Sequence, residues 1–372
     1  MATLFEKTKI KNMTLANRSV RSATWEGLAN EDGTTNSRLN NLMVELVKGG
    51  VGLIITGLAY VHKDGQSDPW QLSIDRDECI SELNKMTNAV HEAGGKIAVQ
   101  ISHAGIESDP SLSGFLPQGP TAMKNSRGEM AREMTSDMIH DTCEHFKKAA
   151  ARAREAGFDA LQLHGAHGWL QGQFLSSYYN RRQDEYGGSL KNKARFTMEL
   201  LQGARSAVGD DFPILMKLNS CDYLENGFSI DEMVELSVAL ESAGIDAIEL
   251  SGGTKYSGKY NLVREGRLAT EEEEVYYREA AGRYKQKVNV PLMLVGGIRS
   301  HTVVEKLLND GLVDYVSFCR PLIREPGLIN RWKSGDTSRA TCLSDNLCTI
   351  PARSGRGLWC VVEEGLQSKH IK

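Results

Sequence analysis

Short apolar runs alternate with longer amphipathic stretches along the whole chain. In segments such as TCEHFKKAAARAREAG and SIDEMVELSVALESAG, apolar residues recur every three or four positions, which predicts helices with one buried face. Several helices are expected to end at an Ala-Gly pair, as at Ala156-Gly157, because glycine readily adopts the left-handed conformation that closes a helix. The apolar runs between the helices predict strands at 17–24, 51–57, 96–101, 159–164, 213–219, 246–251, 291–296 and 313–318.

Eight strands, each followed by a helix, predict an α/β fold of the TIM (β/α)8 barrel type. An open doubly wound sheet would more often carry a glycine-rich phosphate motif after its first strand, where this chain has Ala23-Thr24-Trp25-Glu26. The alternation in LFEKTKIKNMTL predicts an N-terminal hairpin that plugs the barrel floor. We therefore expect one barrel domain over residues 1–335 and a short C-terminal extension over residues 336–372.

Composition narrows the class of protein. The 372 residues are 40% hydrophobic and 25% charged, as in ordinary globular proteins, and an α/β barrel of this size can be one domain. A net charge of −4 gives no basic field, so neither nucleic acid nor a membrane is expected as a partner. The odd number of cysteines, seven, and the absence of a signal-peptide pattern at the start predict a cytoplasmic, reducing location. We expect a small-molecule substrate.

Polar residues and glycines collect at the predicted carboxyl ends of the strands, where a barrel builds its active site. Lys217 lies inside the apolar run PILMKLN, where a buried ammonium needs an anion or another partner. Gly296-Gly297 and Arg320 follow the last two strands, where barrels commonly bind phosphate with a short extra helix, for which EPGLINRW is the candidate. The alternative to a phosphate site is that Gly296-Gly297 only forms a tight turn and that Arg320 pairs with a carboxylate of the chain.

His164 and His167 form an H-x-x-H pair at the end of the fourth strand. Two imidazoles at this spacing can bind a metal, but no Asp or Glu at a neighbouring strand end is the obvious third ligand, so no metal is predicted. A structural hydrogen-bond network is one alternative. The other is that both rings donate to one oxygen of a ligand, such as a carbonyl whose charge grows during reaction.

The segment HGAHGWLQGQFLSSYYNRRQDEYGGS at 164–189 resembles the signature of the old yellow enzyme family of FMN oxidoreductases. The resemblance extends to NRSVRSATWEG, GGVGLIITG, SGG, VGGIRS and Arg320-Pro321-Leu322, and it reaches to about residue 335. The most similar branch includes 2,4-dienoyl-CoA reductase and trimethylamine dehydrogenase. The resemblance implies FMN in the barrel mouth, NAD(P)H as co-substrate, and pairing of the chain into a homo-oligomer.

The resemblance also assigns roles to single residues. Ala23, Thr24 and Gly57 would line the isoalloxazine ring, and Gln100 would pair with its pyrimidine edge. Lys217 would lie near N1 and the C2 carbonyl, where a cation stabilises the reduced ring. The phosphate would be held by residues after the last two strands: Gly296, Gly297, Cys319 and Arg320.

Trp169 stands where the family usually carries a tyrosine that protonates the substrate alkene, and His164 and His167 would grip the substrate beside it. An indole N–H is too weak an acid to release its proton at neutral pH. Water or another hydroxyl must then supply the proton, with Tyr178, Tyr179 and Tyr256 as conceivable donors, or the oxidant needs none. Trp25 replaces a smaller residue of the family, and it is expected either near the ring or at a subunit interface.

The C-terminal extension carries a degenerate cysteine motif. The multidomain branch binds an iron–sulfur cluster through four cysteines, and this chain has Cys342, Asp345, Cys348 and Cys360 at the matching places. Such clusters normally need four thiolates, so we expect that the cluster is lost, with an Asp-ligated cluster as the alternative.

The function predicted from these observations is hydride transfer from NAD(P)H through FMN to a small oxidant, an activated alkene, a quinone or a similar compound. Two alternatives stay open: a flavin-binding barrel with little ene-reductase activity, and a metal-dependent lyase or hydrolase on the same fold.

Overall fold

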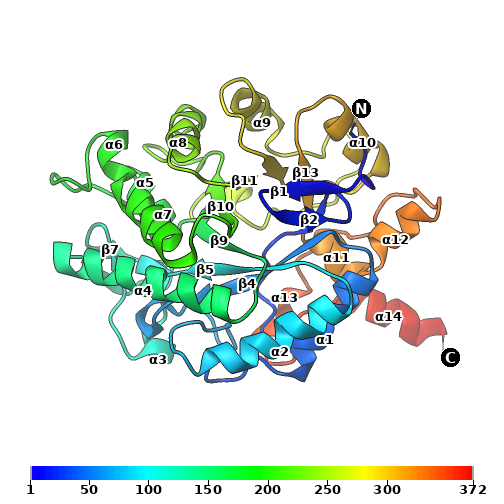
Figure 1. Ribbon diagram of the computed structural model, residues 1–372, viewed down its shortest axis with the longest axis horizontal. Coiled ribbons are helices and arrows are strands. Elements are labelled where there is room, and N and C mark those ends of the chain that lie inside the picture. The colour runs from blue at the N-terminus through cyan, green and yellow to red at the C-terminus, as the bar shows by residue number, and fades with distance from the viewer. Residues whose placement is uncertain (1, 371–372) are drawn as a thin grey trace.

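A closed ring of eight parallel strands forms the centre of the molecule in the computed structural model, which describes residues 2–370 (Figure 1). The strands follow one another around the ring in chain order, so each pairs with its predecessor. Each strand overlaps one of the predicted apolar runs, with β4, β5 and β9 ending one to three residues beyond theirs, and the predicted barrel is confirmed. The strands are β3 (Ser19–Arg21), β4 (Leu53–Tyr60), β5 (Ile97–Ser102), β9 (Ala160–Gly165), β10 (Ile214–Asn219), β11 (Ala247–Ser251), β12 (Leu292–Leu294) and β13 (Tyr315–Phe318).

Helices cover the outside of the ring and return the chain to the next strand (Figure 1). Their apolar faces are buried against the strands, as Leu39, Met43 and Leu46 are in the first helix. The helices of this layer are α1 (Ser37–Lys48), α2 (Cys79–Glu92), α4 (Ser136–Glu155), α5 (Leu170–Leu175), α6 (Leu190–Lys193), α7 (Arg195–Val208), α8 (Ile230–Ser242), α9 (Arg278–Lys285), α10 (His301–Asn309), α11 (Arg320–Arg324) and α12 (Leu328–Lys333). Among the described residues, no helix is both long enough and apolar enough to cross a membrane.

An antiparallel hairpin closes the amino-terminal end of the barrel, as the sequence predicts. It consists of β1 (Thr8–Ile10) and β2 (Met13–Leu15), and its side chains Ile10, Met13 and Leu15 pack into the barrel interior. Tyr315 anchors it through contacts of its hydroxyl with Thr8 Oγ1 and the Lys9 carbonyl, both at 3.1 Å. With this end sealed, the opposite, carboxyl end of the barrel is open for a site.

Two segments depart from the regular alternation of strands and helices. Between β5 and β9 the chain forms a small excursion that the sequence pattern does not predict, made of α3 (Pro110–Ser113), β6 (Gln118–Gly119), β7 (Met123–Lys124) and β8 (Met130–Glu133). After the barrel, the extension carries α13 (Thr349–Arg353) and α14 (Val361–His370). Arg38 of α1 donates to the Arg356 carbonyl at 2.5 Å, which ties the extension to the barrel.

Candidate active site

A cavity of about 350 Å³ opens at the carboxyl ends of the strands. The end of every barrel strand, or the loop directly after it, contributes at least one side chain to its wall, and the C-terminal extension contributes several more. Its wall includes these predicted site residues: Ala23, Thr24, Gln100, His164, His167, Trp169, Lys217, Gly296, Gly297, Cys319 and Arg320. The structure thus brings together residues that lie almost 300 positions apart in the chain.

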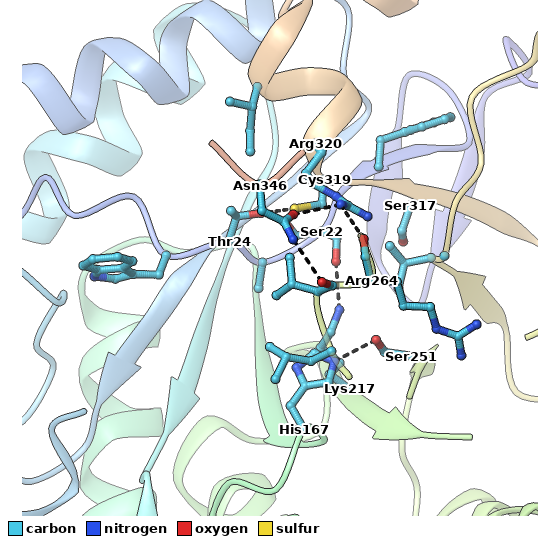
Figure 2. Close-up of a pocket in the computed structure, with 18 of the residues that line it drawn as sticks. Ser22, Thr24, His167, Lys217, Ser251, Arg264, Ser317, Cys319, Arg320 and Asn346 are labelled. Carbon is cyan, nitrogen blue, oxygen red and sulfur yellow. Dashed lines mark hydrogen bonds between the residues drawn. The ribbon is translucent and has the colours of Figure 1, made fainter. Parts of the chain in front are cut away.

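A buried polar chain runs beneath this cavity. Gln100 donates through Nε2 to Gln162 Oε1 at 2.7 Å, and Gln162 donates to Glu249 Oε2 at 2.9 Å. The same carboxylate oxygen lies 2.9 Å from Lys217 Nζ, which also donates to Ser22 Oγ at 2.8 Å (Figure 2). Glu249 is therefore the partner that the buried Lys217 requires.

Lys217 keeps Glu249 ionised despite its burial. Burial by itself raises the pKa of a carboxyl, but Lys217 and hydrogen bonding from Ser22 and Gln162 outweigh it, so the pKa of Glu249 lies below its ordinary value. The side chains of the pair are 3% and 0% exposed, so solvent screens their attraction little. The site therefore has an ammonium at its base whose charge is balanced by a carboxylate.

His164 and His167 lie together at one side of the cavity, with ring centroids 5.4 Å apart and planes nearly perpendicular. His167 has φ +63, a left-handed backbone that is uncommon outside glycine, and its N–H donates to Asn219 Oδ1 at 3.0 Å. The Ala166 N–H approaches His164 Nδ1 at 3.3 Å, which leaves the ring proton of His164 on Nε2. His167 Nε2 lies 2.7 Å from Ser251 Oγ, so this ring already has one partner.

Both imidazoles are neutral at physiological pH. Burial lowers the pKa of His167 to about 3, with Lys217 adding to the effect. Burial, followed by His167 and Lys217, holds the pKa of His164 well below its ordinary value. Two neutral rings can donate a hydrogen bond to a carbonyl or accept one, but they do not bring a positive charge to a ligand.

Trp169 forms the wall next to the histidines. It is 7% exposed, its ring stands edge-on to His164 at 6.2 Å, and the ammonium of Lys255 lies 5.1 Å from its centroid. Trp25 packs in the same apolar cluster and lines the cavity, so it lies at the site. None of the conceivable tyrosine donors lines the cavity: these are Tyr178, Tyr179 and Tyr256.

The other end of the cavity has the features of an anion site. Gly296 and Gly297 have φ +127 and +77, and a Cβ on either would approach a tyrosine ring to within 2.8 Å, so glycine is needed there. Arg320 donates to the Arg264 carbonyl at 2.8 Å and to Asn346 Oδ1 at 2.9 Å (Figure 2). Asn346 belongs to the C-terminal extension, which therefore forms part of this end of the site.

Three guanidinium groups at this end have no carboxylate partner within residues 2–370: those of Arg264, Arg299 and Arg320. Arg264 lies among four tyrosine rings at 4.5 to 5.2 Å, and its Nε and Nη2 are buried without a hydrogen-bond partner in the same part of the chain. Arg299 is buried, whereas Arg264 and Arg320 are half-buried. A cation removed from water without a counter-charge is costly unless an anion joins it. This end of the cavity is therefore suited to a phosphate.

Two predictions about single segments differ from the structure. Gly57 is not in the cavity wall, because its N–H donates to the buried Glu26 carboxylate at 3.0 Å and Leu58 takes the place in the wall. The helix that reaches the cavity is α11, whose Arg320 and Ile323 line it, and not α12 of the EPGLINRW segment, whose apolar side chains are in the core.

Sequence reasoning missed Glu249, Arg264 and Asn346. Glu249 could have been found as Lys217 was, because it is a charged residue inside an apolar run, DAIELS. Arg264 and Asn346 lie in irregular segments after β11 and in the extension, where no periodic pattern indicates which side chains turn inward.

The degenerate cysteine motif does not form a compact ligand set. Within the described residues, no three His, Cys, Asp or Glu side chains are grouped as a metal site. Arg324 approaches Cys360 Sγ at 3.5 Å, in a second cavity between α1 and the start of α14. Cys348 lines the main cavity.

Comparison with known proteins places this site in a family. The sequence pattern of the NADH:flavin oxidoreductase / NADH oxidase family matches residues 3–338. The chain is 35% identical to an NADH oxidase of Thermoanaerobacter brockii, and the match covers 94% of this chain and 54% of the relative. It is 28% identical to a 4,4'-dithiodibutanoate disulfide reductase of Rhodococcus erythropolis, and that match covers 98% of this chain and 96% of the relative. The structure of a 2-naphthoyl-CoA reductase complex superimposes with a TM-score of 0.88 at 27% identity, over 97% of this chain and 56% of that one.

The chain thus spans about half the length of the NADH oxidase and of the naphthoyl-CoA reductase, and nearly all of the disulfide reductase. The match over most of the chain confirms the family predicted from the motif at residues 164–189. The chain belongs to the NADH:flavin oxidoreductase / NADH oxidase family, the family of the old yellow enzymes.

Proposed function

We propose that this chain binds FMN in the cavity at the barrel mouth and passes hydride from NAD(P)H to a small oxidant in a ping-pong cycle. The observation that carries the proposal is the polarity of the cavity. One end offers arginines without carboxylate partners beside Gly296-Gly297, and the base offers Lys217 and Gln100. A phosphorylated ring compound with a polar edge matches both.

The residues present fit FMN. Four side chains in the wall have buried donor atoms with no partner in the described chain: Trp25 Nε1, Ser317 Oγ, Arg264 Nε and Nη2, and Arg299 Nε. Acceptor atoms on a ligand would satisfy them. FMN, when bound, supplies the two-electron chemistry, taking hydride from the reduced nicotinamide and giving it to the oxidant.

The protein supplies binding, orientation and exclusion of water. Lys217 would place its ammonium at the pyrimidine edge, and Arg320 would hold the phosphate, with its guanidinium already oriented by Asn346. His164 would donate from Nε2 to a carbonyl oxygen of the ligand above the ring. Trp25 and Trp169 would cover that ligand and keep water away from it.

The oxidant is proposed to be a quinone or a disulfide in preference to an alkene. Reduction of an alkene places a proton on carbon, which needs a positioned acid, and Trp169 cannot provide one. The oxygen of a reduced quinone and the sulfur of a reduced disulfide take protons from water without a positioned acid. The disulfide reductase of R. erythropolis, similar over almost its whole length, supports including disulfides.

The proposal is tested by anaerobic spectroscopy of the purified protein. We expect a yellow protein with one FMN per chain, bleached by NADH or NADPH and reoxidised faster by benzoquinone or a dialkyl disulfide than by cyclohexenone. The proposal is wrong if the protein neither contains flavin nor takes up added FMN. If the protein binds flavin but neither NADH nor NADPH reduces it, the chain is a flavin-binding protein and the proposed hydride transfer is wrong.

A further inference from the structure

The hydrogen bonds in the buried polar chain beneath the cavity have a fixed order of donors and acceptors. Its members Gln100, Gln162, Glu249 and Lys217 are almost completely buried, so their polar atoms depend on neighbouring groups and not on water. Among these atoms, Glu249 Oε1 has no hydrogen-bond partner within residues 2–370. Gln100 lies opposite Gln162 in the pairing of β5 with β9, and Lys217 lies opposite Glu249 in the pairing of β10 with β11. The backbone register therefore brings the four side chains together in the barrel interior.

We infer that Glu249 is a positioning residue that fixes both polar groups the barrel base presents to its ligand. An ionised carboxylate can only accept hydrogen bonds. Gln162 must then turn its NH₂ group toward Glu249, and its Oε1 is left to accept from Gln100 Nε2. As a result, the Gln100 amide turns its Oε1 acceptor toward the cavity, and one of the two Nε2 hydrogens is used by Gln162.

This orientation selects the chemistry of the ligand edge. Because Gln100 presents an acceptor and Lys217 presents a donor, the ligand must offer an N–H next to a carbonyl or ring-nitrogen acceptor. The imide N–H of a pyrimidinedione, flanked by carbonyl oxygens, has this arrangement. The inference rests on the proposed FMN site and identifies what makes its base selective.

Glu249 also moderates the charge that Lys217 presents. The carboxylate lies 2.9 Å from the ammonium and balances its charge. A reduced flavin carries more negative charge than an oxidised one, so a balanced lysine favours it less than a free lysine would. Removal of the carboxylate should shift binding toward reduced FMN.

Two variants separate the two effects. Glu249→Gln removes the charge and the directional constraint together, because an amide can donate or accept. Gln162→Met cuts the link to Gln100 and leaves the Lys217–Glu249 pair in place. Glu232→Gln is the control, since it removes the carboxylate 2.7 Å from another buried lysine, Lys193, away from the cavity.

The measurements use the full chain with FMN and with FMN methylated at the imide nitrogen. We expect wild type and Glu232→Gln to bind FMN at least about tenfold more tightly than the methylated analogue. Both Glu249→Gln and Gln162→Met should lose most of this ratio. Glu249→Gln alone should raise the affinity for reduced over oxidised FMN by about tenfold, which is about 30 mV in the two-electron midpoint potential.

The outcomes distinguish the inference from the proposed function. Wild type that binds no FMN removes the proposed function and the inference with it. The inference alone is wrong if wild type binds FMN and discriminates against the methylated analogue, but Glu249→Gln changes neither this discrimination nor the ratio of affinities for reduced and oxidised FMN. If Glu249→Gln does not fold, a Gln162→Met protein that keeps the wild-type ratio is enough to overturn the orientation of Gln100.

Discussion

At the scale of single residues, the proposed preference for quinones and disulfides over alkenes depends on Trp169. Trp169→Tyr should speed reoxidation of the reduced protein by cyclohexenone by about tenfold or more, since a positioned acid typically contributes 10²-fold or more. Reoxidation by benzoquinone should change little, because quinone oxygens take protons from water. Stopped-flow kinetics of both oxidants measure the effect, with Trp169→Phe as the control for ring size. Equal enone rates in the tyrosine and phenylalanine variants would contradict the role given to the hydroxyl.

The buried His164 and the half-buried His167 make the stability of the fold depend on pH. Their folded-state pKa values lie below the ordinary value of about 6.5, so the folded protein stays unprotonated where the unfolded chain gains protons. Stability from this source is therefore full above pH 6.5 and is lost as pH falls toward the folded pKa values, at up to about 1.4 kcal/mol per pH unit for each ring. Between pH 6.5 and 5 the free energy of unfolding should fall by about 2 kcal/mol through His167 alone, and His164 should add to the loss in the same direction.

Urea unfolding at several pH values measures this loss. The double variant His164→Asn, His167→Asn should show a shallower decline below pH 6.5, and its curve should run parallel to wild type between pH 7 and 8. Identical slopes in the two proteins at low pH would show that other groups carry the acid sensitivity.

At the scale of elements, the C-terminal extension belongs to the anion end of the site. Asn346 accepts from Arg320 (Figure 2). It also donates to the Val263 carbonyl at 3.1 Å, so it joins the segments after β11 and β13. Asn346→Ala leaves Arg320 with the Arg264 carbonyl alone. Loss of a hydrogen bond to a charged group costs about 1.5 to 3 kcal/mol, so FMN affinity should fall roughly tenfold to a hundredfold.

Flavin fluorescence titration measures the affinity for FMN and for riboflavin, which lacks the phosphate. Asn346→Ala should weaken FMN binding and leave riboflavin binding nearly unchanged, whereas Asn88→Ala on the exposed face of α2 should alter neither. Equal losses for both flavins would mean that Asn346 acts on the fold of the extension and not on phosphate binding.

The elements also show where sequence patterns are informative. All eight strands were predicted, because parallel strands buried on both faces appear as continuous apolar runs that end in glycine or polar residues. Among the residues of the cavity wall, Lys217 was predicted from its position in an apolar run, and Gln100 from the family resemblance. The excursion at 110–133 and the inward turn of Asn346 were not predicted, because short irregular segments are fixed by tertiary contacts such as the one with Arg320.

At the scale of the whole molecule, the site couples ligand binding to the stability of the entire barrel. The end of every strand, or the loop after it, contributes to the cavity wall, so unfolding any part of the ring destroys the site. A ligand that binds only the folded state stabilises it by RT ln(1 + [L]/Kd), about 2.7 kcal/mol at a concentration of 100 Kd. FMN should therefore raise the unfolding midpoint of the barrel as a unit, and more than riboflavin does at equal concentration.

Circular dichroism and flavin fluorescence recorded through one thermal transition test this coupling. The two signals should change together, because flavin release and loss of the barrel are one event when all strands hold the ligand. Flavin released well below the loss of helical signal would show that the loops at the barrel mouth, with the extension, open independently of the ring. In that case the ring would keep its stability without the ligand.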